Sequence, residues 1–348
     1  MKRILIGLAV AAVMGIAAGT AGATKPGPGT STGTARAFVP NPVADLGVGT
    51  FAFRESLTDQ KDADYAALQP AYHQVTLRDL DGSGFLRGRW ANVVSETGNP
   101  AYSPTNTFNY NRHDDEFEQV MAYYWVTESQ RYIRSLGFGT GKFPGANDES
   151  QDLRINQWGL DNSFETDHPK DELRFGKGGV DDAEDAEVIL HEYGHAIHVG
   201  QGFVFGSEEA GAISEGFGDY WAVTVSDVVS KANGVQVTSD LACVADWDSV
   251  SYTSTVPHCL RRVDRNLHYP GDLNGEVHHD GQIWSRALWD IRQALGHEVA
   301  DTIILAAQFN FPGTTMVELA NRTVSTAATL YPGTEVAVKA AFVSRGIL

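Results

Sequence analysis

The alternation of hydrophobic and polar positions predicts a first half that contains short strands and a second half that is mostly helical. Strand-like segments at 72–77 and 88–94 flank turn-like residues at 79–84, and two shorter segments follow at 161–164 and 173–176. We therefore predict an α+β fold with a β-containing N-terminal lobe and a mostly helical C-terminal lobe. Helical spacing of apolar residues predicts helices at 114–136, 181–198, 210–229, 283–295, 299–308, 316–330 and 336–343.

The N-terminus has the pattern of a secretory signal peptide. Lys2 and Arg3 precede an apolar run over 4–18, and the small residues at 21–23 fit a cleavage site. A membrane anchor is the alternative, but the run is shorter than the roughly 20 apolar residues of a span. We therefore expect a secreted protein, extracellular or periplasmic, without a membrane span.

Four segments follow from these patterns. Residues 1–23 are the expected signal peptide, and 24–47 are a leader segment whose start is rich in Gly, Thr and Pro. Residues 48–200 form the expected β-containing lobe, which ends with the helix that begins near Asp181. Residues 201–348 form the helical lobe.

The amino-acid composition excludes a disordered chain and argues against some classes of partner. The chain has 348 residues, of which 42% are hydrophobic, which excludes wholesale disorder. Its net charge of −18 argues against nucleic acid or an anionic membrane as a partner. The two cysteines, Cys243 and Cys259, favour a disulfide if the chain is exported, and two separate buried thiols are the alternative.

Candidate chemistry centres on the segment His191-Glu192-Tyr193-Gly194-His195. Two histidines four positions apart lie one above the other on a helix, so both rings can reach one zinc ion. Glu192, between them, is placed to accept a proton from metal-activated water. Glu215 can supply a third ligand, and Asp219 shares its helix face and can orient a ligand histidine. We therefore expect one catalytic Zn²⁺.

The sequence supports a calcium site less well than a zinc site. The turn at 79–84 resembles a fragment of a calcium loop, but it lacks the third acid and the distal Glu of such a loop. A plain turn is therefore the favoured interpretation, and Ca²⁺ is possible but unsupported.

These motifs, in this order and spacing, resemble the thermolysin-type gluzincins, and the local amino-acid sequence around each motif is more similar to the fungalysins. The resemblance extends from about Tyr72 to the C-terminus and includes Glu276-Val277-His278 ahead of Gly281-Gln282-Ile283-Trp284. It implies a secreted two-lobed zinc peptidase with its cleft between the lobes. It also implies roles for individual residues: metal ligands His191, His195 and Glu215, general base Glu192, oxyanion donor His278, an orienting role for Asp272 at His278, and substrate contacts from Asn162, Ser163 and Arg261, with Arg262 as the alternative to Arg261.

Three departures from the resemblance stand out. The second oxyanion donor of thermolysin, a tyrosine eleven residues after the second histidine, falls on Gly206, beside Phe205. Such families also carry a long propeptide, and the residues ahead of the expected β-containing lobe are too few for one. The calcium sites of thermolysin are not recognisable.

The sequence therefore predicts a monomeric secreted zinc endopeptidase that acts on proteins or peptides. A gluzincin aminopeptidase is one alternative, and an exported zinc-binding protein without turnover is another. Glu192 argues against the last of these, because it is not a ligand and a binding protein has little use for it.

Overall fold

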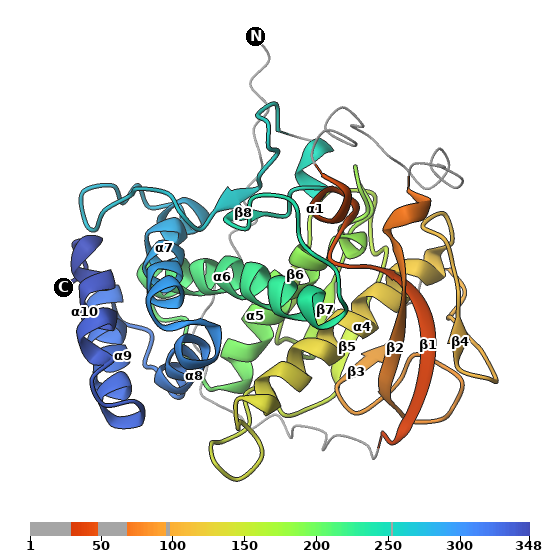
Figure 1. The fold of residues 1–348 in the computed structure, drawn as a ribbon, viewed down its shortest axis with the longest axis horizontal. Coiled ribbons are helices and arrows are strands. Elements are labelled where there is room, and N and C mark those ends of the chain that lie inside the picture. Colours follow the sequence, from red (N-terminus) through yellow and green to blue (C-terminus); the bar gives the residue numbers. More distant parts are fainter. Residues whose placement is uncertain (1–28, 48–67, 95–97, 252) are drawn as a thin grey trace.

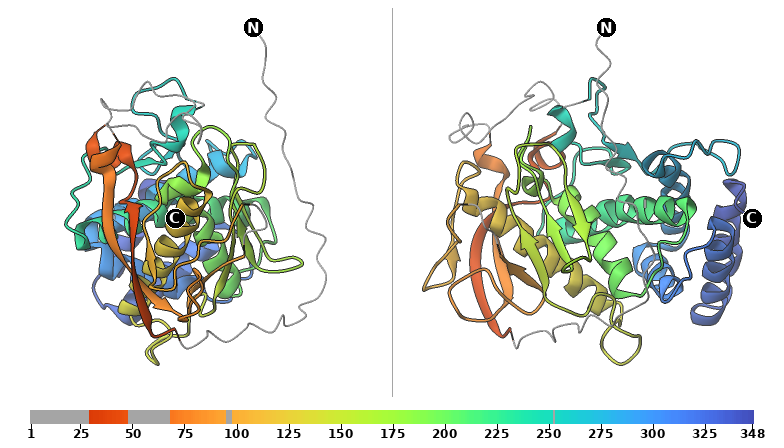
Figure 2. Two further views of the ribbon diagram at one scale, coloured as in Figure 1. Left: turned by 90° about the vertical axis from the view of Figure 1, so that its right-hand side faces the viewer. Right: turned by 180° about the vertical axis from the view of Figure 1, so that it is seen from behind.

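The computed structural model describes residues 29–47, 68–94, 98–251 and 253–348 (Figure 1). The expected signal peptide at 1–23 therefore lies outside the described residues. The two larger sheets lie toward one end of the molecule and helices α7–α10 (residues 277–344) at the other, as Figure 2 shows from two further sides. The α+β fold with two lobes is confirmed. Among the described residues, no helix combines the length and hydrophobicity that a membrane crossing requires.

The outer sheet of the β-containing lobe has the strand order β2-β1-β4. Strand β1 (Ser31–Phe38) pairs antiparallel with β2 (Tyr72–Leu80) and parallel with β4 (Thr107–Phe108). Strand β1 lies in residues that we expected to be a leader segment. Its alternating small and polar residues bury Gly33, Ala35 and Ala37 on one side, and the Gly- and Thr-rich composition hid this pattern.

A second sheet lies next to the candidate site and has the order β3-β5-β7-β6. The first three strands, β3 (Ala91–Val93), β5 (Gln151–Arg154) and β7 (Glu172–Arg174), are parallel. Strand β6 (Phe164–Thr166) pairs antiparallel with β7 and forms one edge of the sheet. The edge strand also packs against helix α5 (Ala186–Gly200).

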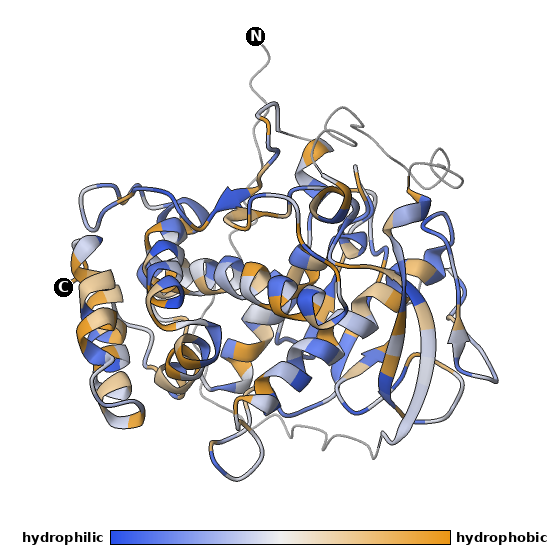
Figure 3. Ribbon diagram, in the orientation of Figure 1, coloured by the Kyte–Doolittle hydropathy of each residue, from blue (hydrophilic) through white to orange (hydrophobic). Residues whose placement is uncertain are grey.

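The predicted helices are confirmed, although α5 begins five residues later than the expected Asp181, after a separate 3-10 segment. The longer buried helices α4 and α6 carry large apolar side chains into the core, and both hydrophobic and hydrophilic residues occur along the helices (Figure 3). The largest difference in a boundary is at α7, which begins at Val277, six residues before the apolar pattern starts at Ile283. The bounds are α1 (Pro42–Leu46), α4 (Asp115–Ser135), α5 (Ala186–Gly200), α6 (Glu208–Ala232), α7 (Val277–Leu295), α8 (His297–Gln308), α9 (Met316–Leu330) and α10 (Glu335–Ser344), with short 3-10 segments η1 (Gln69–Ala71), η2 (Asp182–Glu184) and η3 (Asp248–Ser251).

Glycines bring α6 close to both of its neighbours. A Cβ on Gly218 would lie 2.8 Å from Nδ1 of His191 on α5, and one on Gly216 would lie 2.3 Å from the carbonyl oxygen of Gly281 on α7. Each glycine costs a helix about 1 kcal/mol relative to alanine. In return, the α6 backbone approaches closely enough for its side chains to reach the imidazoles of α5.

The expected disulfide between Cys243 and Cys259 is confirmed, and it joins the start of strand β8 (Cys243–Val244) to the residues before β9 (Arg261–Arg262). The bridge closes the loop that leads to Arg261.

We expect intact mass spectrometry of the exported protein to detect a gain of two hydrogen atoms on reduction, and we expect the Cys243→Ser, Cys259→Ser double variant to melt at a lower temperature. In the chain-entropy model, a loop with a sequence separation of 16 contributes about 3 kcal/mol to the free energy of unfolding. Alkylation of both thiols in the folded, unreduced protein would contradict this prediction.

Candidate active site

Helix α5 presents two imidazoles on one face. Asp185 caps the helix, because its carboxylate accepts a hydrogen bond from the backbone N–H of Glu187 at 3.0 Å. The regular helix that follows places His191 and His195 one turn apart, with ring centroids 4.9 Å apart and ring planes perpendicular. The two rings therefore approach the same point from different directions.

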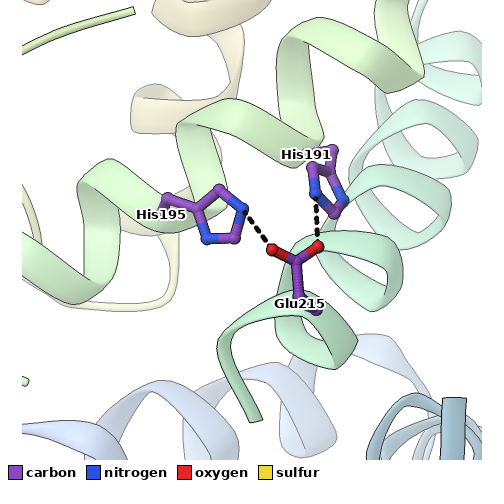
Figure 4. Close-up of side chains that lie close together, drawn as sticks. All are labelled: His191, His195 and Glu215. Atoms are coloured by element: carbon purple, nitrogen blue, oxygen red, sulfur yellow. Dashed lines mark ion pairs between the residues drawn. The ribbon is translucent and has the colours of Figure 1, made fainter. Parts of the chain in front are cut away.

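Glu215 on α6 completes a cluster of three donors (Figure 4). Its Oε2 lies 3.3 Å from Nε2 of His191, and its Oε1 lies 3.6 Å from Nε2 of His195. One donor atom from each residue lies within 4.8 Å of the others. Oε2 of Glu215 is buried and has no hydrogen-bond partner among the described residues. Two imidazole nitrogens and a carboxylate oxygen without a hydrogen-bond donor fit a zinc ion.

Both histidines are oriented through their Nδ1 atoms. Nδ1 of His191 lies 2.9 Å from Oδ1 of Asp219, and Nδ1 of His195 lies 2.8 Å from Oγ of Ser214. Each contact directs the Nε2 atom of the ring toward Glu215. The contact from Asp219 matches the sequence-based expectation, whereas Ser214 was missed.

His198 follows one turn after His195 but points elsewhere. Its ring is fully buried between Phe203 and Phe217, with centroid distances of 4.2 and 4.6 Å, and its Nδ1 shares the hydroxyl of Ser214 at 3.0 Å. This position supports a structural role.

The charges of the cluster favour a cation. Burial opposes a charge on the His191 ring, but the carboxylates of Asp219 and Glu215 outweigh this effect and raise its pKa to about 10. Burial lowers the pKa of His195 to about 4, which keeps that ring in the neutral form that binds metal. Burial also disfavours the Glu215 carboxylate, yet the nearby histidines hold its pKa well below the usual value.

Glu192 lies on the same helix, next to the first of these imidazoles. It is 7% exposed, and no hydrogen bond or ion pair to its carboxylate is found within the described residues. Burial raises its pKa to about 7, against the effect of a positive charge on His191. Its carboxylate is therefore not held by another side chain in the described part of the structure.

His278 reaches the cluster from the first turn of α7. Its Nε2 lies 3.4 Å from Oε2 of Glu215, and its side chain is 50% exposed. Its Nδ1 lies 2.6 Å from Oε1 of Glu276, which also caps α7 by accepting hydrogen bonds from the backbone N–H groups of His278 and His279. A carboxylate therefore orients the ring.

The expectation that Asp272 orients His278 is wrong. Asp272 instead accepts a hydrogen bond from the backbone N–H of His268 at 2.7 Å, and it lies 3.7 Å from the ring of that residue. The chain between Asp272 and α7 turns through Gly275, whose positive φ of 84° separates the aspartate from the helix. Glu276, at the cap itself, takes the position that we assigned to Asp272.

Arg261 rather than Arg262 lies at the cluster. Its guanidinium binds Asp219 through two nitrogens, each 2.7 Å from a carboxylate oxygen, and its Nη2 lies 3.9 Å from Oε2 of Glu215. Arg262 points away and pairs with Asp240 and Asp264 at 2.6 and 2.7 Å.

Asn162 and Ser163 precede the edge strand β6. The backbone carbonyl of Asn162 accepts a hydrogen bond from the indole of Trp158 at 3.1 Å, and the hydroxyl of Ser163 donates to Asp182. The Asn162 side chain is exposed. Both residues therefore lie just before an edge strand that packs against α5.

Gly206 lies in the exposed loop between α5 and α6. The neighbouring Phe205 is 37% exposed, and its ring lies 5.3 Å from that of Phe203. Neither residue has a side-chain donor, so the departure seen in the sequence is also a departure in chemistry.

Comparisons with known proteins agree with this geometry. Residues 175–302 match the profile of the fungalysin metallopeptidase family (M36), and this range contains the histidines, Glu215 and His278. Among solved structures, the chain is similar to the precursor of protealysin, a metalloproteinase from Serratia proteamaculans, with a TM-score of 0.51 and 17% identity over 66% of this chain and 79% of that chain. No curated protein matches the chain significantly. The resemblance to the fungalysin family is confirmed over the matched residues, and the likeness to the protealysin precursor is a likeness of fold.

Proposed function

We propose that this zinc metallopeptidase, whose fungalysin-type domain includes the histidine helix, is a secreted endopeptidase that uses Glu192 as its general base. The observation that supports this proposal is the convergence of two imidazoles and one carboxylate, from two helices, beside a buried carboxylate that is not one of the three donors.

His191, His195 and Glu215 would hold the zinc ion. A bound zinc ion polarises a peptide carbonyl and makes water a stronger nucleophile. Asp219 and Ser214 hold the two imidazoles in place, and the bidentate contact of Arg261 holds Asp219. The chain therefore preorganises its donors through contacts that lie outside the donor set.

Glu192 accepts the proton of the attacking water and returns it to the leaving amine. Its position beside the first ligand histidine and the absence of another partner among the described residues support this role. A protein that only stores zinc has no use for a carboxylate in this position.

His278 donates a hydrogen bond to the carbonyl oxygen as negative charge develops on it. Its Nε2 lies 3.4 Å from a Glu215 oxygen, so the donor already faces the cluster. The backbone at Asn162 and Ser163, ahead of β6, binds the substrate in an extended conformation as an added strand. Arg261 contacts a substrate carbonyl with the nitrogen that lies closest to Glu215.

We expect elemental analysis of the purified chain to find one zinc ion per molecule. Exhaustive chelation should abolish hydrolysis of casein, and one equivalent of zinc should restore it, because His₂Glu suits zinc better than oxygen-preferring cations. Absence of a transition metal together with no uptake of added zinc would contradict the proposed site.

A peptide blocked at both ends separates the endopeptidase from the aminopeptidase. We expect internal cleavage of an N-acetylated, C-amidated fluorogenic peptide, because an extended edge strand binds backbone on both sides of the scissile bond. Cleavage only of peptides with a free amino terminus would favour the aminopeptidase, and zinc binding without cleavage of either peptide would favour the binding protein. Secretion is tested by N-terminal sequencing of the exported chain, which should begin at Thr24.

A further inference from the structure

A second acidic cluster lies apart from the zinc-ligand residues. Asp161 precedes the edge strand β6, Asp182 lies in η2 just before the zinc-ligand helix, and Asp248 opens η3. One carboxylate oxygen from each lies within 4.8 Å of the others. Asp182 and Asp248 are 2% and 3% exposed, and Asp161 is half-buried and open to solvent on one side.

The buried carboxylate of Asp182 receives few stabilising contacts from the surrounding protein. Its Oδ2 accepts a hydrogen bond from Ser163, whereas its Oδ1 is buried and has no partner among the described residues. Within the same part of the chain, no lysine, arginine or histidine forms an ion pair with Asp161 or Asp182. Burial raises the pKa of Asp182 to about 8 despite the hydrogen bond from Ser163. At neutral pH this carboxyl can therefore ionise fully only with a counter-charge beside it.

The backbone leaves one side of the cluster without a side chain. Gly179 has a φ of 76°, and a Cβ built on it would lie 2.7 Å from Oδ2 of Asp161 and 2.4 Å from Oγ of Ser251. That hydroxyl already donates to Asp161 at 2.6 Å. Any other residue at 179 would fill the approach to the Asp161 carboxylate.

We propose that Asp161, Asp182 and Asp248 bind a calcium ion that fastens the residues before β6 to η2 and η3. Calcium accepts carboxylate and hydroxyl oxygens at about 2.3–2.6 Å, so two oxygens on opposite sides of one ion lie up to about 5 Å apart. Magnesium, with bonds of about 2.0–2.1 Å, requires oxygens within about 4.2 Å and a more regular octahedron. The exposed side of Asp161 leaves room for water ligands and for entry of the ion.

This site would stabilise the substrate edge rather than take part in hydrolysis. Asp161 immediately precedes Asn162, and Asp182 accepts the hydroxyl of Ser163. An ion here would link the proposed substrate-binding backbone to the segment that leads into α5. The proposal does not depend on the zinc chemistry, because none of its three ligands belongs to the zinc cluster.

The test measures calcium binding in the full-length, zinc-loaded Glu192→Gln variant, in which self-digestion is suppressed. We expect calcium up to about 10 mM to raise its melting temperature in a saturable way, by roughly 3–5 °C, and isothermal titration to detect one site per chain. Asp182→Asn and Asp161→Asn, each added to this background, should remove both the thermal shift and the binding heat. In calcium-free buffer, Asp182→Asn should melt at or above the temperature of its parent, because it removes charge repulsion and keeps the shape.

Asp167→Asn is the matched control, since Asp167 is an exposed acid in the turn after β6. It should retain the full calcium response. A melting temperature that does not change with calcium, or a response that survives in Asp182→Asn, would overturn the proposal. An equal shift with magnesium, or with potassium chloride at matched ionic strength, would overturn the assignment to calcium.

Discussion

The Glu192→Gln variant is expected to lose peptide hydrolysis by a factor of about 10²–10⁴ or more while it keeps its zinc. The amide has the shape of the carboxylate, but it cannot accept a proton from the attacking water. Glu192 lies outside the donor cluster, and its carboxylate forms no hydrogen bond or ion pair with another side chain in the described residues. The loss should therefore appear in kcat, with the melting temperature and the metal content close to those of the parent protein.

The metal content of the variant and a matched control variant distinguish the loss of a base from other causes of inactivity. Elemental analysis of the variant separates loss of a base from loss of the ion, because zinc lost together with activity would reveal a structural role for Glu192. Glu208→Gln, the same change at an exposed glutamate at the start of α6, is the control and should behave like the parent. Near-parental kcat in Glu192→Gln would remove the general base from the proposal.

The helices and the cluster of candidate metal donors could be predicted because they depend on local spacing. Four residues make slightly more than one helical turn, so His191 and His195 had to share a face once the helix was recognised. Glu215 and Asp219 have the same spacing on α6, and their contacts with His191 follow from the close approach of the two helices at Gly218. Periodicity therefore predicted the helices and the convergence of His191, His195 and Glu215.

The contacts that position the donors could be predicted less well, because they depend on turns and caps. Asp272 and Glu276 are both acidic residues shortly before His278, and spacing alone did not distinguish them. The cap geometry of α7 decides between them, because Glu276 contacts the ring and the helix N-terminus together. Ser214 has no motif of its own, and only the packing of α6 against α5 places its hydroxyl beside His195.

Two long-range assemblies, the proposed calcium cluster and the pairing of β1 with β2, left no trace in the sequence. The proposed calcium ligands are separated by 21 positions between Asp161 and Asp182 and by 66 between Asp182 and Asp248. Each lies among other acids in a chain with a net charge of −18, so none stands out. Strand β1 was missed for a related reason, since its partner β2 is 34 residues further along and its composition is typical of a linker.

The His278→Ala variant is expected to lower kcat by a factor of about 10²–10³ with a much smaller change in KM. The imidazole donates to an oxygen that becomes negative only as the carbonyl is attacked, so its contribution is larger in the transition state than in the bound substrate. In the loop between α5 and α6, Phe205 and Gly206 provide no side-chain hydrogen-bond donor. More of the stabilisation of the oxyanion therefore depends on His278. We therefore expect the upper end of the range.

Neighbouring variants distinguish this role from a structural one. Glu276→Gln keeps an oxygen that can cap α7 but removes the charge that orients the ring 2.6 Å away, so it should lower kcat by about tenfold and leave the melting temperature nearly unchanged. His279→Ala is the control, because that ring contacts Asp280 at 3.0 Å rather than the zinc donors, and it should keep kcat. A kcat for His278→Ala within a factor of a few of the parent value would show that the ring merely occupies the start of the helix. The oxyanion would then have to be stabilised by Arg261, whose Nη2 lies 3.9 Å from Glu215 and is the nearest other cationic donor described at the cluster.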